Sequence, residues 1–95
     1  MILVIATVRP HPGLGPEYEA AVAKIMPQVR AANPEILFYQ AARCREEPDT
    51  YRVVEAYTDQ AAMERHVSSP ALKAFLAQVM PLVAEVDIKL HDAVA

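Results

Sequence analysis

The chain has 95 residues, a net charge of −3 and 54% hydrophobic residues. This length leaves room for one domain, residues 1–95. The core of so small a domain is limited, so we expect association to contribute to stability. Because Arg and Lys are few and scattered, the composition argues against a nucleic-acid partner. No apolar run reaches the length of a membrane span and no charged segment precedes the first run, so we expect neither a membrane helix nor a signal peptide.

The first half of the chain predicts a strand, a helix and a second strand. Residues 1–8 are apolar on both alternating faces, which is typical of a strand that needs cover on both sides. From Glu17 to about Ala32 apolar residues recur at helical spacing, and Pro27 should kink this helix or end its first segment. Residues 36–44 alternate as a second strand.

The second half predicts a hairpin, two short helices and a last strand. Residues 45–49 form a short turn into a third strand, residues 51–57. Asp59 is expected to cap a helix that runs through His66, and Ser69 followed by Pro70 should begin another. The apolar face that this last helix is expected to bury consists of Leu72, Phe75, Leu76, Val79 and Met80. A fourth strand is expected last, in which Val86, Ile88 and Leu90 alternate with Asp87, Lys89 and His91, so that one of its faces lies in solvent.

The order β-α-β-β-α-β predicts a ferredoxin-like α+β fold, a four-stranded antiparallel sheet with both helices on one face. We expect the first and third strands to lie at its centre and to run parallel to each other. Since the first strand is apolar on both faces, the uncovered face should pack against the same face of a second copy. The pattern therefore predicts a homodimer through the sheet face, a dimeric α+β barrel.

Glu55 and His66 are the residues best suited to acid–base chemistry. Glu55 has apolar neighbours along the third strand, so its carboxylate needs a hydrogen-bond partner or a raised pKa. His66 exchanges protons near neutrality and could act as a general base oriented by Glu55. Both residues could instead be structural, with Glu55 bonded to backbone donors or to Arg43 or Arg52.

The other candidates are weaker. Tyr39 and Tyr57 could donate phenolic hydrogen bonds in a pocket between the helices and the sheet, although aromatic residues on strands are usually core. His11 and His91 are expected in solvent, and no pair of histidines has a metal-ligand spacing. The single Cys44 is expected to be an inert thiol in a reducing cytoplasm. Neither glycine lies in a phosphate-binding loop, so no nucleotide, flavin or nicotinamide cofactor is indicated.

Residues 55–66, with Ser68-Ser69-Pro70 and Phe75 after them, resemble the signature of the antibiotic biosynthesis monooxygenase domain, in which a strand ends in glutamate, any residue and an aromatic, and the next helix carries a histidine. The resemblance implies a dimeric enzyme that uses no metal or organic cofactor and oxidises a small quinol, phenol or anthrone-like compound with molecular oxygen. It implies His66 as base or donor, Glu55 as its orienter, and Tyr39, Tyr57 and Phe75 at the substrate.

Two functional classes remain open from the sequence. The first is the cofactor-independent monooxygenase, and the second is a non-catalytic dimeric α+β barrel that binds a small apolar ligand. Haem degradation, the activity of another branch of this fold, is disfavoured because the chain contains no Trp.

Overall fold

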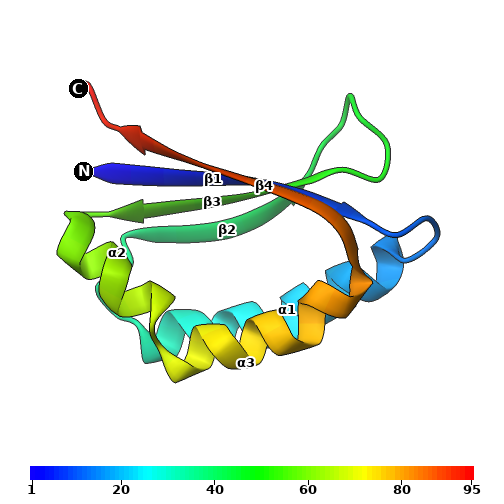
Figure 1. Cartoon of the computed structure of the whole chain (residues 1–95), viewed down its shortest axis with the longest axis horizontal. Coiled ribbons are helices and arrows are strands. Elements are labelled where there is room, and N and C mark those ends of the chain that lie inside the picture. Colours follow the sequence, from blue (N-terminus) through cyan, green and yellow to red (C-terminus); the bar gives the residue numbers. More distant parts are fainter.

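The computed structural model describes all residues of the chain, 1–95, as a sheet with every helix on one of its faces (Figure 1). The elements in chain order are β1 (Ile2–Pro10), α1 (Gly15–Ala32), β2 (Phe38–Arg43), β3 (Tyr51–Tyr57), α2 (Gln60–Val67), α3 (Pro70–Val79), a single 3-10 turn (Met80–Leu82) and β4 (Val83–Asp92). This order confirms the ferredoxin-like prediction, with the second helical connection divided in two at Ser68-Ser69.

The strands lie in the order β2-β3-β1-β4, and every neighbouring pair is antiparallel. The expectation that β1 and β3 lie at the centre is confirmed, but the expectation that they run parallel is wrong. The reason is the hairpin. The α1 crossover returns the chain so that β2 runs in the direction of β1, and the tight turn after β2 then reverses β3.

Helices α2 and α3 begin at the predicted capping residues, whereas α1 begins after Leu14 without a side-chain cap. The Asp59 side chain accepts a hydrogen bond from the Ala62 amide at 2.9 Å, and Ser69 Oγ accepts one from the Leu72 amide at 3.2 Å. Helix α1 continues through Pro27, so this proline does not end its first segment. Pro27 lies on the exposed side, where water can bond the carbonyl that lost its donor. None of the helices combines the length and the apolar character that a membrane crossing requires.

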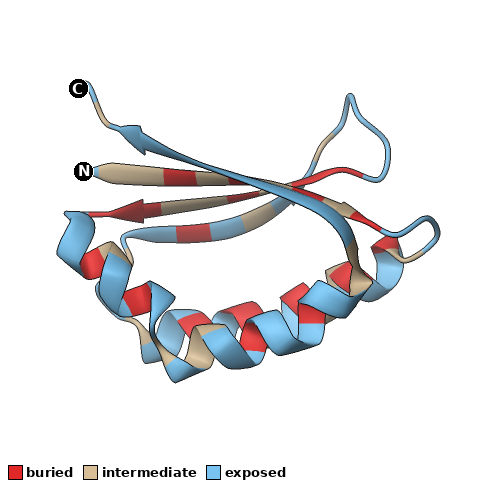
Figure 2. Cartoon of the chain, in the orientation of Figure 1, coloured by how far each residue is buried: buried red, intermediate tan, exposed pale blue.

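The core lies between the helices and one face of the sheet. In β1 the side chains of Val4, Ala6 and Val8 point into it, and Val53 of β3 joins them. The cover is incomplete at β4, which is exposed along its length (Figure 2). Val86, Ile88 and Leu90 pair with the buried positions of β1, yet they remain 43 to 59% exposed because no helix reaches them. The predicted fourth strand is present, but within a single chain its apolar face is exposed as well as its polar face.

Helix α3 buries less than its sequence predicts. Phe75 and Val79 are in the core, whereas Leu76 and Met80 are exposed, contrary to expectation. Phe75 and Val79 join the core residues of β1 and β3. Leu76 and Met80 instead line the cavity together with Val86 and Ile88 of β4. Leu76 and Met80 consequently border an opening rather than a packed layer.

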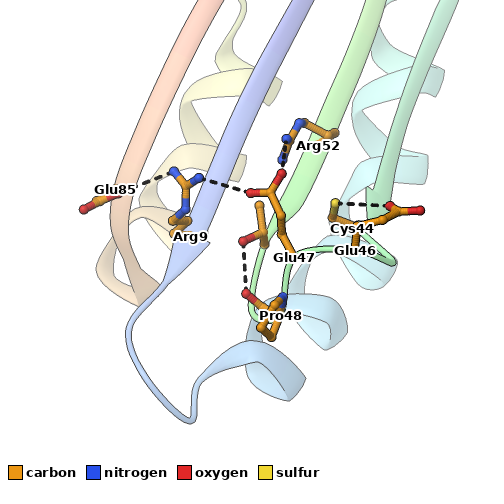
Figure 3. A network of polar contacts seen from close by, with 8 residues as sticks. Arg9, Cys44, Glu46, Glu47, Pro48, Arg52 and Glu85 are labelled. Atoms are coloured by element: carbon orange, nitrogen blue, oxygen red, sulfur yellow. Dashed lines mark hydrogen bonds and ion pairs between the residues drawn. The ribbon is translucent and has the colours of Figure 1, made fainter.

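The opposite face of the sheet carries no helix and divides into two halves. At one end Glu47 of the β2–β3 turn contacts Arg52 and Arg9, and Arg9 also reaches Glu85 (Figure 3). The same turn places Cys44 Sγ 3.9 Å from a Glu46 carboxylate oxygen (Figure 3). The other end is apolar on β1, β2 and β3, with Lys89 and His91 of β4 beside it. We call it the apolar half of the open face, and it consists of Leu3, Ile5, Phe38, Val54 and Ala56.

Candidate active site

A cavity of about 340 Å³ lies between the sheet and helices α2 and α3. Its walls are apolar except at one end, where Glu55 and His66 lie. The volume falls in the range of small-molecule sites, which typically combine apolar walls with a few placed polar groups. One wall is formed by β4 through Val86, Ile88 and Leu90, whose exposure leaves the cavity open on that side.

Strand register places Glu55 in this cavity. Along β3 alternate residues point to the helices, and Val53, Glu55 and Tyr57 share that side. Glu55 is paired with Val4 of β1 and with Tyr39 of β2, so the carboxylate is flanked from both neighbouring strands. A shift of one residue would move it to the open face. The apolar residues on either side of the sheet therefore fix the position of the acid.

Helix α2 supplies His66. Ala62 and His66 are one turn apart and form the buried stripe of this helix. The imidazole lies against both tyrosines, with its centroid 5.4 Å from the Tyr39 ring in a T-shaped arrangement and 5.7 Å from the Tyr57 ring. Only 2% of His66 is exposed. Aromatic packing, rather than solvent, surrounds this histidine.

The polar contacts at this end of the cavity converge on one oxygen. The Tyr57 hydroxyl donates a hydrogen bond of 2.5 Å to Glu55 Oε1. His66 Nε2 lies 3.5 Å from the same oxygen but forms no hydrogen bond with it, and both ring nitrogens are buried without a partner. The Glu55 side chain, in contrast, is 16% exposed. Glu55 is thus bonded to Tyr57, while His66 is its close but unbonded neighbour.

Burial shifts the titration of the whole cluster toward neutral forms. It raises the pKa of Glu55, and the hydrogen bond from Tyr57 lowers that pKa in part. Burial also lowers the pKa of His66, so the contact between the two residues is not a developed ion pair. The pKa of Tyr57 is raised by burial and by its bond to Glu55, and that of Tyr39 by burial and by the Glu55 charge.

All five predicted site residues line this one cavity: Glu55, His66, Tyr39, Tyr57 and Phe75. The alternative partners of Glu55 are engaged elsewhere. Arg43 forms two hydrogen bonds of 2.6 and 2.8 Å to Glu19, and Arg52 contacts Glu47 on the open face. No group of three or more His, Cys, Asp or Glu side chains is close enough to hold a metal ion.

Sequence reasoning missed the contribution of β4 to the cavity. Its alternation predicted which side chains share a face, but not that this face is the cavity wall. The partner of Glu55 was also left open. Tyr57 is two positions along the same strand and therefore on the same face, so the alternation of β3 contained that signal.

Because burial raises the pKa of Glu55, we expect the contribution of this residue to the free energy of unfolding to depend on pH. Between its ordinary pKa of 4.5 and the raised value, the folded protein holds a proton that the unfolded chain has released. The free energy of unfolding of the wild type should therefore fall as pH rises through this window. In Glu55→Gln this loss is absent, so the variant should gain stability relative to the wild type as pH rises.

Urea denaturation of both proteins from about pH 5 to about pH 8 measures the difference. The lowered pKa of His66 acts in the opposite direction, because it adds stability as pH rises toward the ordinary histidine value of 6.5. That contribution is present in both proteins and largely cancels in the comparison. A stability difference that stays constant with pH would contradict the buried carboxylate.

The profile of the antibiotic biosynthesis monooxygenase family matches residues 1–78. Among solved structures, a Caulobacter crescentus CB15 protein assigned to these monooxygenases superposes with a TM-score of 0.89 at 32% identity, over 99% of this chain and 90% of that one. A mutant of SnoaB, a cofactor-independent oxygenase from Streptomyces nogalater, gives a TM-score of 0.83 at 19% identity, over 99% and 93%. A Deinococcus radiodurans protein gives 0.84 at 17%, over 98% and 92%. No protein with a curated description matches the sequence.

Proposed function

Because the chain belongs to the antibiotic biosynthesis monooxygenase family, we propose that it is a cofactor-independent monooxygenase that oxidises a small quinol, phenol or anthrone-like compound with molecular oxygen. One observation carries the proposal. An acid–base pair, Glu55 and His66, lies in the wall of an otherwise apolar cavity of substrate size. SnoaB, a cofactor-independent oxygenase with the same fold, supports the reaction class.

The chemistry requires a base, a hydrogen-bond donor and the exclusion of water. Removal of a proton gives an enolate or phenolate that is electron-rich enough to pass an electron to oxygen. For an anthrone-type methylene, the resulting radicals combine into a carbon hydroperoxide, which loses water to leave a carbonyl. One oxygen atom enters the product, and the other leaves as water with the two methylene hydrogens. The apolar walls strengthen the base and protect the intermediates.

The two tyrosines have different capacities to bind substrate. The Tyr57 hydroxyl is committed to Glu55, whereas Tyr39 lies across from the carboxylate and makes no such bond. Tyr39 is therefore the proposed donor to the substrate oxygen that becomes negative. Phe75 forms part of the apolar wall.

The distribution of polar groups sets the orientation and charge of the proposed substrate. Its hydroxyl or acidic carbon lies near Glu55, and its apolar body extends toward Ile88, Leu90 and Met80. No Lys or Arg lines the cavity, so a carboxylate or phosphate on the substrate would find no counter-charge there. The cavity favours an uncharged aromatic compound.

We also propose that two copies associate through the open face of the sheet. No helix covers the apolar half of that face, defined above. Ala56 is buried by its neighbours, Leu3, Ile5 and Val54 are partly exposed, and Phe38 at the edge is 52% exposed. Exposed apolar patches of this kind are typical of interfaces. A two-fold pairing of identical sheet faces would bury the patch on both copies.

Oxygen consumption with a panel of uncharged anthrones and quinols in the presence of a chelator tests the activity. The wild type should consume oxygen above the protein-free rate and should incorporate one atom of labelled oxygen into the product. The double variant Glu55→Gln/His66→Leu should lose about 10²- to 10⁴-fold in kcat, the usual contribution of acid–base groups.

Glu64→Gln is the matched control, because Glu64 is a carboxylate on the exposed side of α2 and should leave the rate intact. Consumption at the protein-free rate with every compound would reject the monooxygenase. Saturable binding of the same compounds without turnover would then favour the second class, a non-catalytic barrel with an apolar ligand.

A further inference from the structure

We infer that Glu55, rather than His66, accepts the substrate proton, and that Tyr57 positions it. The inference rests on the proposed function and reverses the roles that the sequence implies. It follows from which atoms a bound substrate can reach, from how the carboxylate is held, and from the charges that each proton transfer would create.

Access to the polar atoms separates the two candidates. A general base must come within hydrogen-bond distance of the proton that it removes. Both residues line the cavity, but both nitrogens of His66 are buried and its ring packs against Tyr39 and Tyr57. The Glu55 side chain keeps 16% of its surface exposed. A substrate can reach the carboxylate without any rearrangement, whereas the imidazole nitrogens would have to be uncovered.

The carboxylate is held in a way that leaves it basic. Tyr57 donates to Oε1, which fixes the orientation of the group and leaves the second oxygen as an acceptor. The groups that face Glu55 are Tyr57 from its own strand, Tyr39 from β2, His66 from α2 and the apolar Val4 from β1. None of them is a permanent cation, so nothing holds the carboxylate strongly ionised.

The number of charges that each proton transfer creates favours the same assignment. When Glu55 takes the proton, the substrate becomes an anion and the carboxylate becomes neutral, so one negative charge moves and none is created. Transfer to His66 would instead create an imidazolium and a second anion beside ionised Glu55. Creating charges inside apolar walls is costly. The proton on Glu55 is available afterwards for the peroxide oxygen that leaves as water.

Binding of 4-nitrophenol tests the base without any oxygen chemistry. This phenol is yellow when ionised and nearly colourless when neutral, so absorbance reports where the proton lies in the complex. Just below the pKa of the free phenol, the wild type should increase the yellow fraction on binding. Glu55→Gln should bind the phenol in its neutral form, and His66→Leu should still ionise it. Glu64→Gln again serves as the control.

The opposite pattern, ionisation by Glu55→Gln and none by His66→Leu, would overturn the assignment, as would a wild type that leaves the bound phenol neutral. Oxygen uptake is measured in parallel. Ionisation by the wild type without uptake would reject the monooxygenase and retain Glu55 as the proton acceptor. With uptake, Glu55→Gln should lose about 10³-fold in kcat and His66→Leu less than about tenfold.

Tyr57→Phe tests the positioning role through the pH profile. The rate should rise with pH as Glu55 ionises, and the midpoint should move to higher pH in Tyr57→Phe because the hydrogen bond that favours the ionised form is lost. Tyr39→Phe provides the comparison, since Tyr39 does not bond Glu55 in the structure. An unchanged midpoint in Tyr57→Phe would overturn the positioning role of Tyr57.

Discussion

Replacing Phe75 with alanine is expected to lower the free energy of unfolding by about 3 kcal/mol. Phe75 is 5% exposed and contributes both to the main core and to the cavity wall. A loss of this size is a large share of the total stability of a small domain.

The neighbouring Leu76→Ala is the matched control for this experiment. Leu76 is 40% exposed at the border of the cavity, so its truncation should cost less than about 1 kcal/mol. Phe75→Leu, which keeps most of the apolar volume, should retain the fold and separate a packing defect from a binding defect. Urea titration gives all three values. Equal losses in Phe75→Ala and Leu76→Ala would show that α3 presents a different stripe to the sheet.

Ile5→Asp is expected to convert a dimer into a monomer. Ile5 lies in the apolar half of the open face, opposite Val54 on one side and Lys89 on the other. In a two-fold pairing of sheet faces each copy would bury this position, so the substitution would place two carboxylates in one apolar interface. The cation beside each of them, Lys89, already contacts Asp87 at 3.7 Å. Light scattering should report twice the 10.5 kDa of a single chain for the wild type and one chain mass for the variant.

Ala20→Asp provides the control, because it introduces the same charge on the exposed side of α1. That variant should keep the mass of the wild type. Circular dichroism must show that Ile5→Asp remains folded, and Ile5→Thr offers a milder change if it does not. A wild-type protein that is monomeric at micromolar concentration would reject association through the open face, without affecting the proposals on the cavity.

Local signals were sufficient for the elements of this fold. Asp59 and Ser69 act as caps because their side chains bond amides only a few residues away, and such contacts depend on the sequence alone. The apolar neighbours of Glu55 along the third strand likewise indicated that it would be partly buried. The relative direction of β1 and β3 was mispredicted. It depends on two connections together, the α1 crossover, which keeps the strand direction, and the β2–β3 hairpin, which reverses it. No single segment of the sequence carries that information.

The sequence by itself determined the architecture and the small set of chemically capable residues. It did so because capping, alternation and helical spacing act over short distances along the chain. Only the tertiary structure decided which of these residues contact one another and which of their polar atoms are buried. Side-chain packing bonded the Tyr57 hydroxyl to Glu55, and strand register placed Glu55 opposite Tyr39. The packing of α2 against the sheet buried both nitrogens of His66 and placed its ring beside those of Tyr39 and Tyr57. The exposure of the apolar face of β4 could not be predicted from the sequence either. Apolar alternation indicates which side chains share a face, but not whether another element covers that face.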